Sequence, residues 1–169
     1  MSSRRGNVFV SCDPEKCVGC RICEYACSYE KDKSFNPLRS RIRALRIYPD
    51  INLAITCRLC QDAPCVKACP RDALTQSKET GRIIVDEDEC NGCGWCIEAC
   101  DFGAMTLDPE EKIVKVCDQC STREDEQPQC IEWCPEEALS LTSRDALAQK
   151  ARIGITEKLF KEALETEST

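Results

Sequence analysis

Short runs of aliphatic residues, separated by turn-forming residues, dominate the hydrophobic pattern of this chain. In residues 51–56, Ile51, Leu53 and Ile55 alternate with smaller or more polar residues, which is the two-residue period of a half-buried strand. Glu79-Thr80-Gly81 places a turn directly before another such run. The pattern predicts strands at residues 7–11, 42–48, 51–56, 73–76, 82–86, 104–107, 112–116 and 138–141.

The segment beyond residue 141 has a different pattern. Thr142-Ser143-Arg144-Asp145 is a helix-start signal, with an acidic residue three positions after a threonine. The apolar residues that follow are interrupted at Gly154, and they are Ala146, Leu147, Ala151, Leu159, Phe160, Ala163 and Leu164. We predict two short helices in residues 142–169, forming a tail after a domain at residues 1–141. The tail either packs against its own domain or lies on a partner subunit.

The composition makes a purely hydrophobic core implausible. Only 5% of the 169 residues are aromatic, whereas 17 are cysteine and none is histidine. A cysteine content near one in ten indicates either a disulfide scaffold or a metal protein. The lack of histidine excludes histidine-bearing zinc sites, histidine-ligated haem, and Ser-His-Asp or Cys-His catalysis.

Sixteen of the 17 cysteines form four groups with related spacing. The first and third groups read C-x2-C-x2-C-x3-C, the second C-x2-C-x4-C-x3-C and the fourth C-x2-C-x9-C-x3-C. In chain order the groups are Cys17, Cys20, Cys23 and Cys27; Cys57, Cys60, Cys65 and Cys69; Cys90, Cys93, Cys96 and Cys100; and Cys117, Cys120, Cys130 and Cys134. The remaining cysteine, Cys12, is predicted to be a small buried side chain and not a ligand.

This spacing is typical of 4Fe-4S binding. Three cysteines at short intervals wrap a loop around one cluster, and the fourth, on the first turn of a helix leading away, reaches a different cluster. Gly19, Gly92 and Gly94 stand between ligands, where the backbone must pass close to sulfur. Zinc modules instead separate two C-x2-C pairs widely, so iron–sulfur clusters are the favoured interpretation.

The cysteine motifs closely resemble those of the four-cluster ferredoxin-like subunits that accompany DMSO reductases, formate dehydrogenases, hydrogenases and CO dehydrogenases. The segments similar to the family's second, third and fourth motifs are CRLCQDAPCVKACP at residues 57–70 with Asp72-Ala73-Leu74, CNGCGWCIEAC at residues 90–100 with Phe102-Gly103-Ala104, and Cys117-Asp118-Gln119-Cys120 with Pro128, Cys130 and Cys134-Pro135. The resemblance covers residues 8 to about 141. Ser28 and Asp101 replace a proline that often follows the fourth cysteine, which changes an exit turn but no ligand.

The resemblance implies which cysteines share a cluster. The first and fourth motifs exchange their last ligands, as do the second and third. The implied ligand sets are Cys17, Cys20, Cys23 and Cys134; Cys117, Cys120, Cys130 and Cys27; Cys57, Cys60, Cys65 and Cys100; and Cys90, Cys93, Cys96 and Cys69. The implied fold is α+β: two stacked bacterial-ferredoxin-like 2 × 4Fe-4S units with short antiparallel hairpins and a C-terminal helical tail.

An insertion at about residues 37–56 carries closely spaced arginines. Arg39, Arg41 and Arg43 alternate with other residues, so a hairpin turning at Tyr48-Pro49-Asp50 would carry an arginine-lined face. Two interpretations remain open. The arginines either offset carboxylates and cluster charge on the same chain or form a docking edge for an acidic partner.

Charge and hydropathy restrict the partners and the compartment. Residues 1–84 hold 15 Lys and Arg against 9 Asp and Glu, whereas residues 85–169 hold 8 against 21. An acidic chain without a basic tail argues against nucleic-acid binding. No run approaches 18 apolar residues, and Arg4-Arg5 is not followed by an apolar signal core. We therefore expect a cytoplasmic protein with reduced thiols and no direct membrane insertion.

These observations predict electron transfer and no substrate chemistry of the chain's own. It carries no phosphate-binding glycine loop, dinucleotide fingerprint or nucleophile–base pair. We expect the small iron–sulfur subunit of an anaerobic oxidoreductase complex, which relays electrons to or from a larger catalytic subunit and possesses four 4Fe-4S clusters. The resemblance favours a tungsten or molybdenum partner of aldehyde oxidoreductase or benzoyl-CoA reductase type. The alternatives are a free-standing polyferredoxin, or a partner of a CO dehydrogenase or hydrogenase; further electron-transfer subunits are compatible with each.

Overall fold

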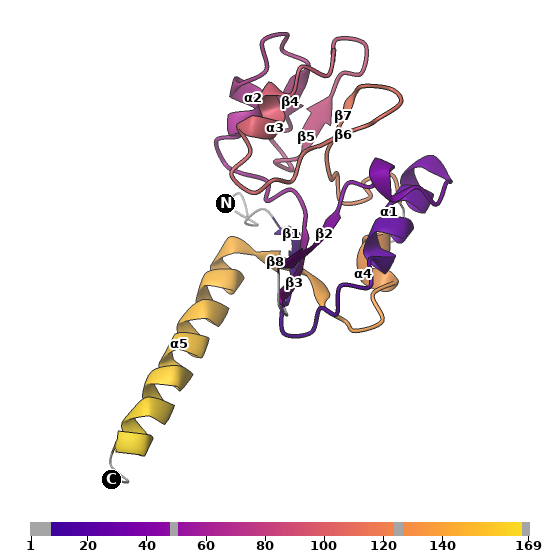
Figure 1. Ribbon diagram of the computed structural model, residues 1–169. Helices are drawn as coiled ribbons and strands as arrows, with labels where there is room; N and C mark the ends of the chain where they lie inside the picture. The colour runs from indigo at the N-terminus through magenta and orange to yellow at the C-terminus, as the bar shows by residue number, and fades with distance from the viewer. Residues whose placement is uncertain (1–7, 48–50, 124–126, 167–169) are drawn as a thin grey trace.

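The computed structural model describes residues 8–47, 51–123 and 127–166. The chain forms small hairpins and short helices, and it ends in one long helix (Figure 1). In chain order the elements are β1 (Val8–Cys12), α1 (Ile22–Asp32), the 3₁₀ helix η1 (Pro37–Arg39), β2 (Arg43–Ile47), β3 (Ile51–Ile55), α2 (Pro64–Lys67), β4 (Leu74–Gln76), β5 (Ile83–Val85), α3 (Trp95–Glu98), β6 (Thr106–Leu107), β7 (Val114–Lys115), α4 (Gln129–Glu132), β8 (Leu139–Ser143) and α5 (Arg144–Thr166).

The strands form four separate antiparallel pairs. Three pairs join neighbours in the sequence: β2 with β3, β4 with β5, and β6 with β7. The fourth pair joins β1 to β8 and so brings the two ends of the cysteine-rich region together, with Val10 opposite Leu141. All eight predicted strands are confirmed, with ends that agree to within two residues where they are described. The predicted ends at residues 7 and 48 lie outside the described residues.

Two hydrophobic clusters make up the interior, and both contain cysteines. The β1–β8 core contains Val10, Ile42, Ala54 and Leu139 together with cysteines of the first and fourth groups. The β4–β7 core contains Leu74, Ile83, Met105, Val114 and Val116 together with cysteines of the second and third groups. Figure 1 shows the corresponding division, with α2, α3 and β4–β7 on one side and β1–β3, β8, α1 and α4 on the other.

The arginine-lined hairpin face is a wrong prediction. Arg39 lies in η1, and its Nε is 2.9 Å from Oδ2 of the fully buried Asp108. Arg41 precedes β2, with its Nη1 3.8 Å from Oδ1 of Asp118. Arg43 turns back to donate to the carbonyl oxygens of Pro37 and Leu38. Their charges are offset by carboxylates and carbonyls of the same chain, so these residues are not a free docking edge. The proposed turn at residues 48–50 lies outside the described residues.

The Arg39–Asp108 pair joins the two sides of the molecule. Burial opposes the charge of Asp108, but the backbone N–H groups of Glu111 and Glu110 and the charge of Arg39 outweigh it and lower the pKa of this carboxyl. The Asp108 side chain accepts from these N–H groups at 3.0 and 2.9 Å. Breaking a buried pair leaves an uncompensated charge, so this contact holds η1 against the chain that follows β6.

The tail is one helix, and the prediction of two short helices is wrong. α5 runs through Gly154 for 23 residues, because a single glycine costs only about 1 kcal/mol in a helix of otherwise good helix formers. The helix starts one residue later than the sequence signal suggests, with Ser143 Oγ accepting from the Ala146 N–H at 3.1 Å.

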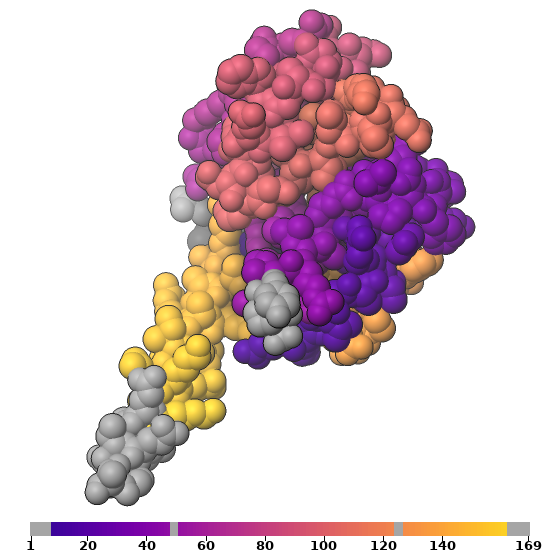
Figure 2. Space-filling model, in the orientation of Figure 1, coloured from indigo at the N-terminus to yellow at the C-terminus, as the bar shows by residue number. Residues whose placement is uncertain are grey.

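α5 extends away from the rest of the protein (Figures 1 and 2). Its residues from 144 to 161 are exposed, apart from the half-buried Gly154. In its first two turns it contacts the domain: Arg144 donates to the carbonyl oxygen of Leu59, and Lys150 Nζ lies 2.8 Å from Asp13 Oδ2. The alternative in which the tail packs against its own domain is therefore wrong for the described residues.

Candidate metal centres

The four cysteine groups share one local fold. In each group the third cysteine is the second residue of a helix: Cys23 in α1, Cys65 in α2, Cys96 in α3 and Cys130 in α4. The fourth cysteine is four residues further on, and positions i and i+4 lie on the same face of a helix. In groups two to four this cysteine follows the last helical turn and does not open a new helix, contrary to prediction. About five residues then separate it from the next strand, which leaves no room for another helix.

The residue before the second cysteine has a left-handed conformation in every group. The four residues, with φ of 70°, 50°, 67° and 60°, are Gly19, Leu59, Gly92 and Gln119. A residue of this kind turns successive N–H groups toward one side of the loop, forming a concave surface that favours negative charge. Sequence reasoning identified the two glycines and missed Leu59 and Gln119. Aligning the four motifs would have revealed them.

The first set of predicted ligands lines a small, partly enclosed cavity of about 20 Å³. Cys17, Cys20 and Cys23 of the first group line it together with Cys134 of the fourth group. Ala44, Ala54 and Leu139 complete its apolar wall, as part of a fourteen-residue lining. The structure thus brings together cysteines more than 100 residues apart, and the β1–β8 pair positions them.

A second small, partly enclosed cavity, of about 10 Å³, repeats this arrangement on the other side of the molecule. Cys90, Cys93 and Cys96 of the third group line it with Cys69 of the second. Leu74 and Val114 of the β4–β7 core form part of its wall. Cys93 is exposed at this cavity, as Cys20 is at the first one.

Electrostatic proximity of the thiols is consistent with the two remaining sets. Burial, together with the neighbouring Cys65, Cys60 and Cys100, raises the pKa of Cys57 to about 11. Cys57, Cys60 and Cys65 thus lie near the last cysteine of the third group.

The set around Cys117 is the most deeply buried. Burial raises the pKa of Cys117, and the charge of Cys27 is the next contribution in the same direction. Burial likewise raises the pKa of Cys130 well above its usual value, with Cys117, Cys27 and Cys120 adding to the rise. All four of these thiols are buried. The structure therefore brings Cys27 of the first group to the first three cysteines of the fourth.

Backbone N–H groups point at three of the exchanged cysteines. The Sγ atoms of Cys27, Cys100 and Cys134 accept from Arg41, Ala104 and Ala138 at 3.3, 3.4 and 3.3 Å. Such hydrogen bonds stabilise a thiolate and influence the reduction potential of any iron–sulfur cluster that it ligates. The chain turns toward these N–H groups through left-handed residues, Gly103 before Ala104 and Glu137 before Ala138.

The donor chemistry fits an iron–sulfur cluster. Every donor is a cysteine, and soft thiolates select iron–sulfur clusters among the metal groups of proteins. Burial raises the pKa of Cys117 and of Cys130, so these two thiols would be protonated at neutral pH without a cationic group, and metal binding would release their protons. Among the described residues, no three histidine, cysteine, aspartate or glutamate side chains form a site for a single metal ion.

Cys12 lies beside the first set but does not line its cavity. Burial raises its pKa to about 11; the Ala54 backbone hydrogen bond opposes the rise, and Cys17 and Cys134 add to it. The side chain is half-buried against the β1–β8 core. Its predicted role as a packing residue stays a prediction.

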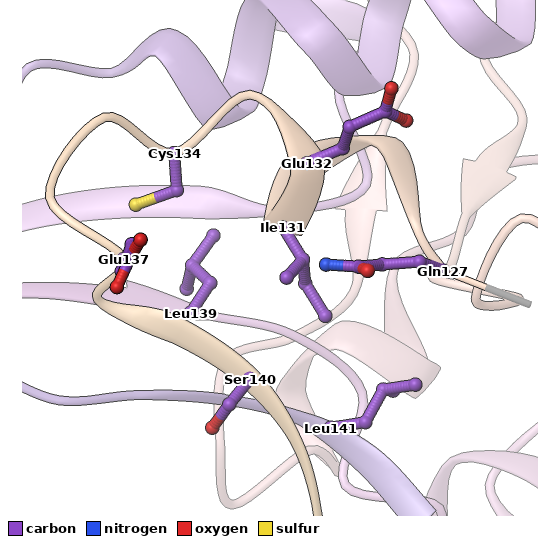
Figure 3. Close-up of a pocket in the computed structure, with 8 residues that line it drawn as sticks. All are labelled: Gln127, Ile131, Glu132, Cys134, Glu137, Leu139, Ser140 and Leu141. Atoms are coloured by element: carbon purple, nitrogen blue, oxygen red, sulfur yellow. The ribbon is translucent and has the colours of Figure 1, made fainter.

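An open groove of about 730 Å³ adjoins Cys134, between α4 and β8 (Figure 3). The side chains of Ile131 and Leu139 lie at its centre, and Glu132 and Glu137 are among its polar lining residues. The first cysteine set therefore approaches the surface both here and at Cys20.

Replacing Gly92 with alanine is expected to damage the third group. A Cβ at this position would clash with the carbonyl oxygen of Lys112, and the φ of +67° adds strain. We expect Gly92→Ala to lower the free energy of unfolding by about 2–4 kcal/mol and to reduce bound iron. Gly103→Ala is the matched control, because its φ is +60° but nothing lies within 4 Å of the added Cβ. It should cost only about 1 kcal/mol. Anoxic denaturant titration with iron analysis measures both, and equal effects would contradict the steric argument.

Comparisons with known proteins agree with this chemistry. The family model described as "4Fe-4S dicluster domain" matches residues 51–144. A polyferredoxin-like subunit of aliphatic sulfonate oxidoreductase from Pyrococcus furiosus is 39% identical over 129 residues, which cover 76% of this chain and 72% of the relative. The electron transport protein HydN of Escherichia coli is 34% identical over 164 residues, covering 85% and 92%. The probable anaerobic dimethyl sulfoxide reductase chain YnfG of Escherichia coli is 35% identical over 158 residues, covering 82% and 74%.

A solved structure has the same fold. The "Active site complex BamBC of Benzoyl Coenzyme A reductase in complex with Benzoyl-CoA" includes a chain that matches with a TM-score of 0.50 at 24% identity, over 94% of this chain and 96% of that one. Among the helices of the described residues, none is both long and apolar enough to cross a bilayer.

The fold and the cysteine chemistry define an iron–sulfur protein of the electron-transfer class, similar to electron transport proteins and to subunits of oxidoreductases. The chain belongs to the 4Fe-4S dicluster domain family.

Proposed function

We propose that this chain relays electrons one at a time through four 4Fe-4S clusters between a larger catalytic subunit and an external donor or acceptor. The observation that supports this best is the small cavity lined by Cys17, Cys20, Cys23 and Cys134, which is repeated by the cavity lined by Cys69, Cys90, Cys93 and Cys96. In both, three cysteines of one group meet the last cysteine of another, which is the ligand exchange of two-cluster ferredoxins.

The proposed ligands comprise all sixteen grouped cysteines in the sets described above. Two dicluster units follow from them, one around the β1–β8 core and one around the β4–β7 core. Electrostatic proximity of Cys27 to Cys117 and of Cys100 to Cys57 supports the other two sets. The two cores contain different cysteines, which supports two dicluster units stacked on each other.

The residues of the chain hold and insulate the electron path. When bound, a 4Fe-4S cluster supplies a site that accepts and releases one electron without a substrate bond being made or broken. The buried thiolates fix each site, and backbone N–H groups such as those of Ala104 and Ala138 stabilise the negative charge on sulfur. Apolar residues of the two cores, including Leu139 and Leu74, limit the access of water.

The proposed partner is a larger catalytic subunit, of the tungsten or molybdenum type predicted from the resemblance, in an anaerobic cytoplasmic complex. The Pyrococcus furiosus relative, itself named as an oxidoreductase subunit, supports the role of a subunit. The exposed apolar residues of α5 support a docking element on this chain.

A free-standing polyferredoxin is the second candidate. The relative HydN is named an electron transport protein, without reference to an enzyme, and this name favours the free-standing carrier. The cluster content would be the same in both cases, and the role of α5 separates them.

Iron and sulfide analysis tests the proposed clusters. Protein purified without oxygen is expected to hold about 16 iron and about 16 acid-labile sulfide per chain, since each cubane contains four of each. Cys120→Ser removes a buried ligand and should lower the count by about one cluster, whereas Cys12→Ser should leave it unchanged. Stoichiometric zinc without labile sulfide would overturn the proposal, and about eight iron would limit it to two clusters.

A further inference from the structure

Arg58 occupies an unusual position between the two sides of the molecule. It directly follows Cys57, and its guanidinium carbon is 4.8 Å from the ring centre of Phe9 and 5.8 Å from that of Phe102. Phe9 is a buried residue of β1 on the β1–β8 side, whereas Phe102 lies two residues after Cys100 on the β4–β7 side. The cation is therefore held by one aromatic ring from each side, an arrangement that the cation–π attraction stabilises.

The charge of Arg58 is not neutralised by a carboxylate in the part of the chain that the structure describes. Other basic residues near the cysteine groups are paired: Arg71 lies 3.0 Å from Glu89, and Lys31 lies 2.7 Å from Asp118. The neighbours of the Arg58 guanidinium are aromatic rings and the Cys12 thiol, with which it interacts electrostatically. A charge in such surroundings is less screened than one paired in water.

Chain connectivity and a ring contact link Arg58 to one set of proposed ligands. Cys57 precedes it, and Phe102, which contacts it, follows Cys100 of the same set. Arg144 donates to the carbonyl oxygen of Leu59, so the backbone around Arg58 is also anchored from the start of α5. On its other side, Cys12 adjoins Cys17 and Cys134 of the first set.

We infer that the fixed positive charge of Arg58 raises the reduction potential of the cluster ligated by Cys57, Cys60, Cys65 and Cys100. Reduction adds one negative charge to a cluster, so a fixed cation nearby stabilises the reduced form more than the oxidised form. An electron arriving from either side would then be favoured at the boundary between the two cores. The inference rests on the proposed function, because it requires that these cysteines bind a cluster.

The test is a redox titration of anoxically purified holoprotein, followed by electron paramagnetic resonance. In Arg58→Gln, one cluster signal should become harder to reduce by on the order of tenfold in its equilibrium constant, which is about 59 mV for a one-electron couple. Arg58→Lys keeps the charge and should retain most of the potential. Arg46→Gln, which removes an exposed arginine of β2, is the control for loss of any positive charge and should leave all signals unchanged.

A second variant keeps the inference testable if Arg58→Gln does not load with iron. Phe102→Glu places a carboxylate beside the Arg58 guanidinium, at a position that is half-exposed. Because this carboxylate offsets the charge of Arg58, the variant should lower the same reduction potential although Arg58 is still present. Phe102→Leu is its control and should have little effect. Cys60→Ser identifies the affected signal, which should be the one altered by this ligand change.

The outcomes separate this inference from the proposed function. Four loaded clusters with unchanged potentials in Arg58→Gln and Phe102→Glu would overturn the role of Arg58 alone. Equal shifts in all four signals would also overturn it, because they would indicate a general charge effect. Wild-type protein without iron and sulfide would overturn the proposed function itself.

Discussion

Removing the iron from this protein is expected to abolish its cooperative unfolding transition. Cysteines make up much of both cores: Cys65 and Cys96 belong to the β4–β7 core, and Cys23, Cys27 and Cys130 to the β1–β8 core. Without clusters, the cysteines that line the two cavities would be left as unpaired thiols between short two-stranded hairpins. Two-stranded hairpins are marginal by themselves, and a domain with few aromatic side chains has little apolar surface to bury in their place. The apoprotein should therefore lack a stable core.

Circular dichroism during anoxic heating measures this effect. The iron-loaded protein should give a sigmoidal transition, and protein treated with an iron chelator under mild denaturation should give a gradual change. Rebuilding the clusters with iron and sulfide should restore the transition, which controls for irreversible damage. A sharp transition in protein shown to contain no iron would contradict the prediction that the clusters form the core.

Much of the local structure could be predicted because its determinants are close together in the sequence. The strand β5 follows Glu79-Thr80-Gly81, and the actual turn includes a hydrogen bond from the Gly81 N–H to the Ser77 carbonyl oxygen at 2.9 Å. Alternating hydrophobic residues likewise identified β2 and β3. The cysteine spacing required loops followed by helical turns, and the four groups repeat that arrangement.

The failures concern contacts between distant segments. The partners of Arg39 include Asp108 and Glu111, about 70 residues away, and no local pattern shows that Asp108 is fully buried. The alternation of Arg39, Arg41 and Arg43 therefore suggested an exposed face that η1 interrupts. Arg58 was also missed as a candidate functional residue, because its significance depends on Phe9 and Phe102, which only the fold brings together.

The continuity of α5 has a local explanation that the sequence pattern understated. Gly154 was treated as a break, yet a glycine within a long helix lowers helix stability without ending it. Because α5 makes few contacts with its own domain, no packing constraint requires a bend at this position. The described side chains thus form an extended rod with apolar residues on more than one side, which suits a helix enclosed by another protein.

Deleting residues 146–169 is expected to leave the clusters intact and to remove binding to the catalytic subunit. No cysteine lies beyond Cys134, and the deletion retains β8 and the contact of Arg144 with Leu59. The lost segment includes Leu159 and Phe160, which are 60% and 67% exposed. Burying each such side chain in a complex contributes roughly 1.5–3 kcal/mol, so losing both should weaken binding by roughly a hundredfold or more.

Point variants separate apolar docking from the mere presence of a helix. Leu159→Ser with Phe160→Ser should reproduce most of the binding loss at unchanged iron content, measured by co-purification and by calorimetry with the isolated partner subunit. Lys158→Ser with Lys161→Ser alters exposed charges on the same turns and should have an effect below threefold, since exposed ion pairs contribute at most about 1 kcal/mol. Loss of iron on truncation would show that α5 supports the domain's own fold. Full partner binding by the truncated chain would exclude α5 as the docking element and favour a free electron carrier, because exposed apolar residues on α5 are the feature that supports a bound subunit.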